Sequence, residues 1–220
     1  MNYIFFTGLI GSLILVTGAA WPETQTTKHP ITSFKNWLFA IGGLGMLLYA
    51  IFGYQQGGSI FFVILEILVA VVSSILMMLN APDKVDVPII TLSSLVLIVW
   101  SLYLFEGYAT VLFILGLSGV ALGYTFPMGT LRRGIALTLG SALIALFSYI
   151  EASWIFFWLN VFFAIFSAYY VYKGLIHQRT ATTEEMSRYI DLEAYHRHER
   201  THPFYEEMLA EVLAEVKKRL

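Results

Sequence analysis

The sequence predicts an all-α integral membrane protein with seven transmembrane helices and a charged helical tail. The 220 residues are 58% hydrophobic and 13% charged, whereas a soluble domain carries about 25% charged residues. The charges are uneven, because residues 1–176 contain six Lys or Arg and six Asp or Glu, whereas residues 177–220 contain seven and nine. We therefore expect a transmembrane domain over residues 1–176, followed by a cytoplasmic amphipathic helical tail over residues 177–220.

Seven apolar runs predict the membrane spans, since about 20 helical residues cross the roughly 30 Å hydrocarbon core of a bilayer. The runs are Tyr3–Ala20, Trp37–Tyr54, Gly58–Leu79, Pro88–Phe105, Tyr108–Phe126, Gly134–Ile150 and Ala152–Ile176. The first run ends in Gly18-Ala19-Ala20, which resembles a cleavage site for a secretory signal. No basic residue precedes this run, and its length exceeds that of a usual signal, so we interpret it as a span and keep a signal peptide as the alternative.

The loops between the runs predict the orientation in the membrane. Lys and Arg favour the cytoplasmic side, and here they occur only in alternate loops and after the last span. These residues are Lys28, Lys35, Lys84, Arg132, Arg133, Lys173 and Arg179. We expect an extracellular N-terminus and a cytoplasmic C-terminus, in a plasma membrane or, for a bacterium or archaeon, the inner membrane.

Two stretches 94 positions apart, Gly58–Met78 and Ala152–Tyr172, are similar to each other. Their shared positions are Ser59/Ser153, Phe62/Phe156, Leu65/Leu159, Ala70/Ala164 and Ser73/Ser167, and Glu66 aligns with Asn160. Spans 1–3 and 5–7 each contain a longer basic loop followed by a very short turn. We therefore expect two three-helix repeats, residues 1–80 and 107–176, joined by a linker helix over residues 88–105. One helix separates them, so both run in the same direction, as parallel repeats do.

This 3+1+3 arrangement resembles the SWEET sugar transporters and their PQ-loop relatives. In that family the third helix of each repeat carries a pocket asparagine. Asn160 matches this asparagine in the second repeat, whereas Glu66 replaces it in the first. The family also has a proline near the cytoplasmic end of the first helix of each repeat, and Pro22 and Pro127 match it, although the glutamine that often follows is absent.

The PnuC vitamin transporters, a second family with 3+1+3 bundles, are similar to the region from Leu48-Tyr49 to Gly58, without their tryptophan-rich pocket pattern. The resemblances cover at most residues 1–176 and rest more on architecture than on motifs. They imply a transporter that moves a small polar solute, sugar-like or vitamin-like, by alternating access around a midplane site between the two bundles.

Glu66 and Asn160 are the candidate binding residues. A carboxylate at the centre of a membrane helix costs about 2.5–3.5 kcal/mol on insertion scales, so Glu66 should face a cavity, a partner or water. It would hydrogen-bond a polar solute or carry a proton, and the alternative is a neutral acid bonded to a neighbouring helix. Asn160 would line the opposite wall or simply join helices. With an acid in place of an amide, we expect a solute that is cationic or rich in hydroxyl and amine groups, or a coupled proton.

Aromatic residues and prolines complete the predicted site. Phe62 precedes Glu66 by four residues, and Phe156 and Phe157 precede Asn160 by four and three, so they share its side of the helix. We expect these three rings to supply stacking walls, unless they are lipid contacts. Pro22 and Pro127 are candidate hinges of a cytoplasmic gate, or they simply stop their helices.

Several classes of function lack support in the sequence. The absence of cysteine excludes disulfides, thiolate metal sites and a cysteine nucleophile. No His-Glu-x-x-His or Gly-x-Ser-x-Gly motif occurs, and the spacing of His196, His198 and His202 is too mixed for a metal site. We expect no enzyme activity, cofactor or metal, and a net charge of −2 gives no sign of nucleic-acid binding.

The tail predicts two helices. The first opens at the capping box Thr182-x-x-Glu185, and the second opens near Thr201. The second carries an apolar stripe of Tyr205, Leu209, Val212 and Val216. This stripe would pair with a second copy of the chain or dock on the cytoplasmic face. The alternative function is therefore a non-transporting scaffold or signalling protein that acts through its tail.

Overall fold

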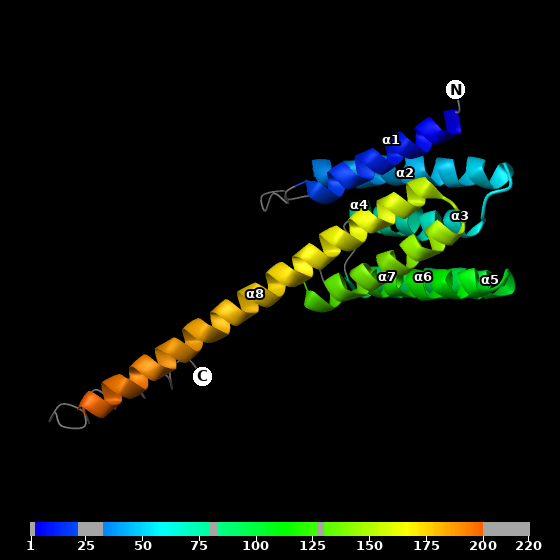
Figure 1. Cartoon of the computed structure of the whole chain (residues 1–220). Coiled ribbons are helices and arrows are strands. Elements are labelled where there is room, and N and C mark those ends of the chain that lie inside the picture. Colours follow the sequence, from blue (N-terminus) through cyan, green and yellow to red (C-terminus); the bar gives the residue numbers. More distant parts are fainter. Residues whose placement is uncertain (1–2, 22–32, 80–82, 127–129, 200–220) are drawn as a thin grey trace. The chain divides into compact units, whose positions relative to one another are not determined.

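The computed structural model describes residues 3–21, 33–79, 83–126 and 130–199, and the regular elements within these ranges are all helices (Figure 1). They are α1 (Tyr3–Ala20), α2 (Phe34–Gln55), α3 (Phe61–Glu66), the π-helical segment η2 (Ile67–Ser73), α4 (Ser74–Leu79), α5 (Asp83–Tyr103), α6 (Tyr108–Thr125), α7 (Leu131–Ile150) and α8 (Trp154–Glu199). Pro22, Pro127 and the second predicted tail helix lie outside the described residues.

The chain divides into two units, Met1–Tyr172 and Lys173–Leu220. The first unit contains α1 to α7 and the start of α8. In the second unit the predicted helix start at Thr182 is wrong, because α8 continues through this position to Glu199. The sequence after Tyr172 is rich in good helix formers, so nothing in it ends the helix there.

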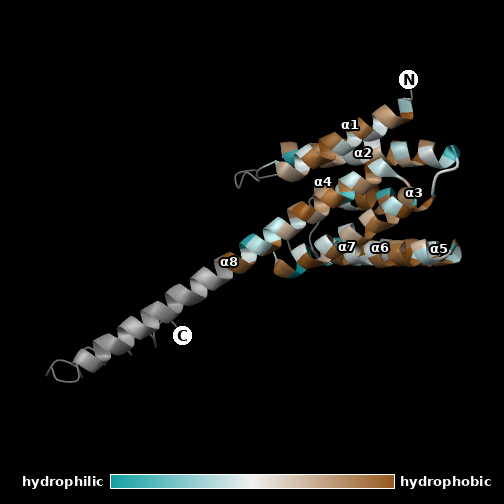
Figure 2. Ribbon diagram, viewed as in Figure 1, coloured by the Kyte–Doolittle hydropathy of each residue, from teal (hydrophilic) through white to brown (hydrophobic). Residues whose placement is uncertain are grey.

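Among the described residues, six helices are long and apolar enough to cross a membrane, and they correspond to every expected span except the third. The third expected span corresponds to the apolar helix of α3, η2 and α4, which begins at Phe61, after the turn at Gly57 with its φ of +89°. Figure 2 shows that apolar residues lie on many sides of these helices. On α5, five large aliphatic side chains are more than half exposed: Leu92, Leu95, Val96, Val99 and Leu102. Such a surface suits lipid rather than water, so the described helices are of the kind that membrane proteins have.

Capping residues fix where two of the helices begin. The Ser33 hydroxyl accepts a hydrogen bond from the Asn36 backbone N–H at 3.4 Å, and α2 follows Ser33. The Thr130 hydroxyl accepts one from the Arg133 N–H at 3.4 Å, and α7 follows Thr130. Each hydroxyl satisfies a backbone donor that the first helical turn leaves without a partner.

Glycines let α1 approach α2 and let α6 approach α7 in the same way. A Cβ on Gly11 would lie 3.0 Å from the carbonyl carbon of Gly45, so the two backbones are in direct contact. A Cβ on Gly119 would lie 2.8 Å from the Cα of Gly140. Small residues that bring backbones together are the usual packing device of membrane helices.

Each helix pair has a second glycine contact, which lies one turn earlier on α1 and on α6. These two contacts are also at equivalent positions. A Cβ on Gly8 would meet the Tyr49 ring at 2.6 Å, and a Cβ on Gly116 would meet the Ile144 side chain at 2.8 Å. Gly8 and Gly116 are 108 positions apart, as are Gly11 and Gly119, whereas Tyr49 and Ile144 are 95 apart, as are Gly45 and Gly140. The two helix pairs therefore pack through equivalent positions.

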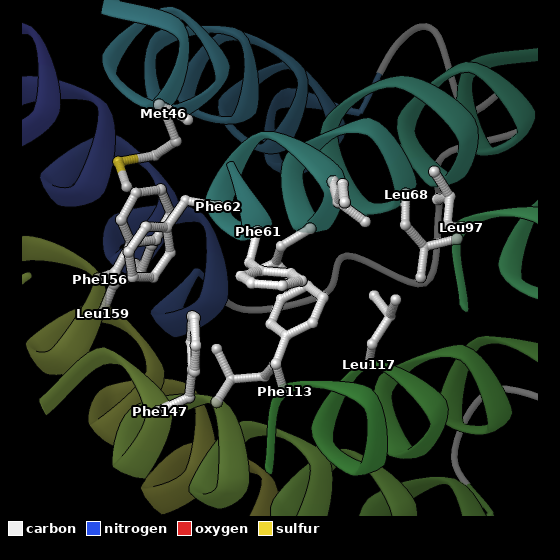
Figure 3. Close-up of a cluster of buried hydrophobic side chains, with 14 of the residues drawn as sticks. Met46, Phe61, Phe62, Leu68, Leu97, Phe113, Leu117, Phe147, Phe156 and Leu159 are labelled. Atoms are coloured by element: carbon white, nitrogen blue, oxygen red, sulfur yellow. The ribbon is translucent and has the colours of Figure 1, made fainter. Parts of the chain in front are cut away.

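The continuous helix formed by α3, η2 and α4 occupies the centre of the first unit, where it contacts both α2 and α5. Its Phe61 ring packs against Phe113 of α6 and Phe147 of α7, with ring centroids 5.0 and 5.7 Å apart (Figure 3). In η2 the turn is wider than in an α-helix, and the Ser74 hydroxyl donates to the carbonyl of Val69, five residues earlier, at 3.2 Å. This π-helical segment begins immediately after Glu66.

Candidate functional site

The rings of Phe62 and Phe156 join the central helix to α8. They stack face to face, with centroids 4.3 Å apart and an interplanar angle of 9° (Figure 3). Both side chains are buried, and they are the residues that align at the offset of 94 positions. Equivalent positions of the third helix and of α8 therefore face each other directly.

Glu66 lies one helical turn from Phe62, on the same side of the helix. Only 2% of its surface is exposed, and its Oε2 is buried without a hydrogen-bond partner among the described residues. None of these residues forms a salt bridge with it. A buried polar atom without a partner loses its hydration without compensation, so burial of the Glu66 carboxyl is unfavourable in this structure.

Asn160 lies one turn from Phe156 and is also buried, with 8% of its surface exposed. Its Nδ2 donates a hydrogen bond to the carbonyl of Phe156 at 2.9 Å, within its own helix. The described residues show no hydrogen bond between Asn160 and Glu66. The amide donor is thus held locally, and Glu66 receives nothing from it.

Both residues lie in the halves of their helices that follow the short turns. Glu66 is the sixth residue of α3, which begins at Phe61, and Asn160 is the seventh residue of α8. At a rise of 1.5 Å per residue, each residue is about 7.5–9 Å from its helix start, whereas half of a hydrocarbon core is about 15 Å.

Phe157, the third predicted wall residue, has different neighbours. Its ring contacts those of Tyr149, Trp154 and Trp158, at centroid distances of 5.8, 5.9 and 5.1 Å. Tyr149, Trp154 and Trp158 are all exposed, while Phe157 is partly buried. The structure thus brings together Glu66, Phe62, Phe156 and Asn160, and gives Phe157 other contacts.

Tyr49 of α2 extends the aromatic surface beside this group. Its ring centroid is 5.6 Å from that of Phe156, and its side chain hydrogen-bonds with Ser153. In Figure 3, Met46, one turn earlier on α2, approaches the stacked rings from the opposite side to Phe147. The sequence patterns do not single out Tyr49, because its helix shows no polar residue in register with the site.

Tyr124 of α6 adds a polar group toward the other end of the helices. Its hydroxyl and that of Ser73 in η2 are hydrogen-bonded, and Tyr124 lies within electrostatic range of both Glu66 and Arg133. The Arg133 guanidinium lies 5.8 Å from the centroid of the Tyr124 ring, and its Nη1 donates to the Phe126 carbonyl at 3.1 Å. Sequence reasoning missed Tyr124, although the shared serine Ser73/Ser167 was a signal for its partner.

The carboxylates of Glu106 and Glu151 lie near each other in the loops outside the spans. Partial burial raises the pKa of Glu151, the neighbouring Glu106 charge raises it further, and Ser59 opposes the shift. No group of three or more metal-ligating side chains occurs in the part of the chain that the structure describes.

Comparison of the chain with protein-family models, with curated proteins and with solved structures gave no match. The resemblance to SWEET and PnuC transporters therefore stays a prediction, and the function has to be argued from the surroundings of Glu66.

Proposed function

We propose that this protein is a membrane transporter that moves a small polar solute by alternating access, with Glu66 and Asn160 at the binding site. The observation that carries the proposal is the buried Glu66 carboxyl, whose Oε2 has no partner among the described residues. A carboxyl that merely held helices together would be bonded to one of them. An acid kept inside membrane helices without such a bond points to a ligand or a proton.

The proposal includes the 3+1+3 arrangement of two parallel repeats. Its support is the equivalent glycine packing of α1 on α2 and of α6 on α7, together with the stacking of Phe62 on Phe156. Two units of the same construction that meet at equivalent residues can rock against each other about that contact. The linker helix of this arrangement is α5.

The stacked rings suggest how one side of the site closes. Phe62 and Phe156 lie between the Glu66–Asn160 level and the short turns. The alternation of basic loops makes the short turns extracellular. In this proposal the stack closes the outer side, and its separation admits solute. Pro22 and Pro127 keep their proposed role near the inner gate.

A binding screen tests the proposal. Purified protein is heated with sugars, nucleosides, vitamins, amino acids and polyamines, and its unfolding temperature is followed beside Glu66→Gln and Asn160→Ala. A ligand at 100 times its Kd stabilises the folded protein by about 2.7 kcal/mol. We expect a stabilising solute whose effect disappears in Glu66→Gln and weakens in Asn160→Ala. If no solute stabilises the protein and both variants are simply less stable, the pair is structural and the proposal is wrong.

A further inference from the structure

We infer that the solute is an organic monocation and that it exchanges with a proton on Glu66, so that this carboxyl holds one or the other and never both. The inference rests on the proposed transporter function and names its substrate class. Its basis is the missing positive charge around Glu66, together with the aromatic surface beside it.

The described protein supplies no cation to Glu66. The basic residues of the described spans lie in the first turns of α2, α5 and α7: Lys35, Lys84, Arg132 and Arg133. Lys173 of α8 belongs to the second unit. Arg133 acts on Tyr124, which itself interacts electrostatically with Glu66, but the Arg133 guanidinium lies over the Tyr124 ring and bonds the Phe126 carbonyl. A buried carboxylate without a counter-charge is strongly disfavoured. The group is therefore neutral because it carries a proton, or neutralised because it is paired with a cationic ligand.

The groups facing Glu66 suit an ammonium better than a sugar. A sugar presents several hydroxyls, each of which needs a partner when it is buried. On the described helices around Glu66 the polar groups are few: the Asn160 amide, one of whose N–H groups is bonded to the Phe156 carbonyl, and the Ser73–Tyr124 pair, whose hydroxyls bond each other. The remaining walls are aromatic, with Phe62 and Phe156 close by and Tyr49 beyond them. Aromatic faces attract a desolvated cation.

The exchange step follows from charge balance. In the proton-loaded state Glu66 carries a carboxylic acid. When a cation binds, the O–H bond of that acid breaks, the proton leaves to water, and the carboxylate pairs with the ammonium. Both loaded states carry the same net charge at the site, while the empty carboxylate carries an unpaired negative charge. Only loaded protein then changes its access, which gives one cation exchanged for one proton.

Other titratable groups near Glu66 are few. Tyr124 of α6 interacts electrostatically with it, and Arg133 of α7 acts on that tyrosine. The groups contributed by the central helix and by α8, Ser73 and Asn160, do not titrate. Tyr49 of α2 hydrogen-bonds with Ser153 instead. A proton released between pH 5 and 8 when a cation binds therefore comes from Glu66.

Proton release is the direct test. The full chain is purified in detergent, transferred to weak buffer with a pH indicator, and mixed with phenethylammonium, choline or tetraethylammonium. Two neutral probes, 2-phenylethanol and glucose, are run beside them. We expect about one proton released per cation bound, and an apparent Kd that rises about tenfold for each unit of decrease in pH while Glu66 is protonated.

Two variants test whether the released proton comes from the Glu66 carboxyl. Glu66→Gln, checked for unchanged unfolding temperature, should lose both proton release and the pH dependence of binding. Glu151→Gln, at the short turn, should keep both. Proton release that persists in Glu66→Gln overturns the inference.

The neutral probes separate this inference from the proposed function. If 2-phenylethanol or glucose binds without proton release and the cations do not bind, the solute class is wrong while the transporter proposal stands. If neither kind of probe binds, and the wider solute screen also finds nothing, both are wrong.

Discussion

The helices before α5 and those after it share their packing but not their polar chemistry. Gly11 against Gly45 repeats as Gly119 against Gly140, and Phe62 stacks on its counterpart Phe156. At the next turn the similarity ends, because Glu66 stands on one side and Asn160 on the other. Among the described helices, only that of Glu66 contains a π-helical segment, and such segments are frequent at functional sites. Shared packing thus builds the bundle, and the departure from it marks the proposed site.

The largest effect should come from breaking the shared aromatic contact. Phe62→Ala and Phe156→Ala should each lower the free energy of unfolding by about 3 kcal/mol, because each leaves a cavity beside a buried ring. The two losses should be equal, since each ring loses the same stacked partner. Unfolding of the purified variants in detergent measures both, with Phe157→Ala as the smaller control. Unequal losses would mean that the two rings do not play equivalent roles.

A middle-sized effect should distinguish the two glycine contacts. A Cβ at Gly140 would lie 2.5 Å from the backbone nitrogen of Val120, whereas one at Gly45 would lie 3.1 Å from the Cα of Gly11. Gly140→Ala should therefore destabilise the protein by about 1–3 kcal/mol, as overpacking does. Gly45→Ala should be nearly neutral, because the gain in helix propensity offsets a milder contact.

Gly53→Ala is the control for this glycine pair. Nothing lies within 4 Å of a Cβ at Gly53, so this variant should unfold at the same or a higher temperature than the parent. Equal destabilisation by Gly140→Ala and Gly45→Ala would show that α6 and α7 are packed no more tightly than α1 and α2.

The smallest effect is expected at the two polar residues, where the change in stability should differ in sign. Asn160→Leu removes the bond to the Phe156 carbonyl and should cost about 1 kcal/mol. Glu66→Leu removes a carboxyl whose Oε2 has no described partner, so it should leave the unfolding temperature unchanged or raise it. The unfolding temperatures at neutral pH give both values. A marked loss of stability in Glu66→Leu would show that the carboxyl is structural.

The sequence predicted those features that depend on local composition. The predicted run Tyr3–Ala20 has the same bounds as α1. The run predicted to begin at Tyr108 shares its first residue with α6, and the run predicted to end at Ile150 shares its last residue with α7. The helix predicted from Pro88 begins earlier, at Asp83, because the charged residues before Pro88 do not belong to an apolar run but suit a helix start. Span length and hydropathy are local properties, so these bounds could be predicted without contacts.

The alignment at 94 positions paired Phe62 with Phe156, and the structure stacks these two rings on each other. Equivalent positions of two similar units face each other wherever the units meet symmetrically. The alignment could not predict that Asn160 would bond within its own helix, since an amide has both local and distant acceptors to choose from.

Only the tertiary structure decided the remaining features of the site. Three features depend on how neighbouring helices pack against one another. They are the π-helical segment η2, the hydrogen bond between Tyr124 and Ser73, and the contact of the Phe157 ring with Tyr149. Sequence spacing places a residue on a face of its own helix, but the partner of that face is set by packing between helices. The sequence by itself therefore determined the spans and placed a carboxyl among them, and the packing decided that this carboxyl would be buried without a partner.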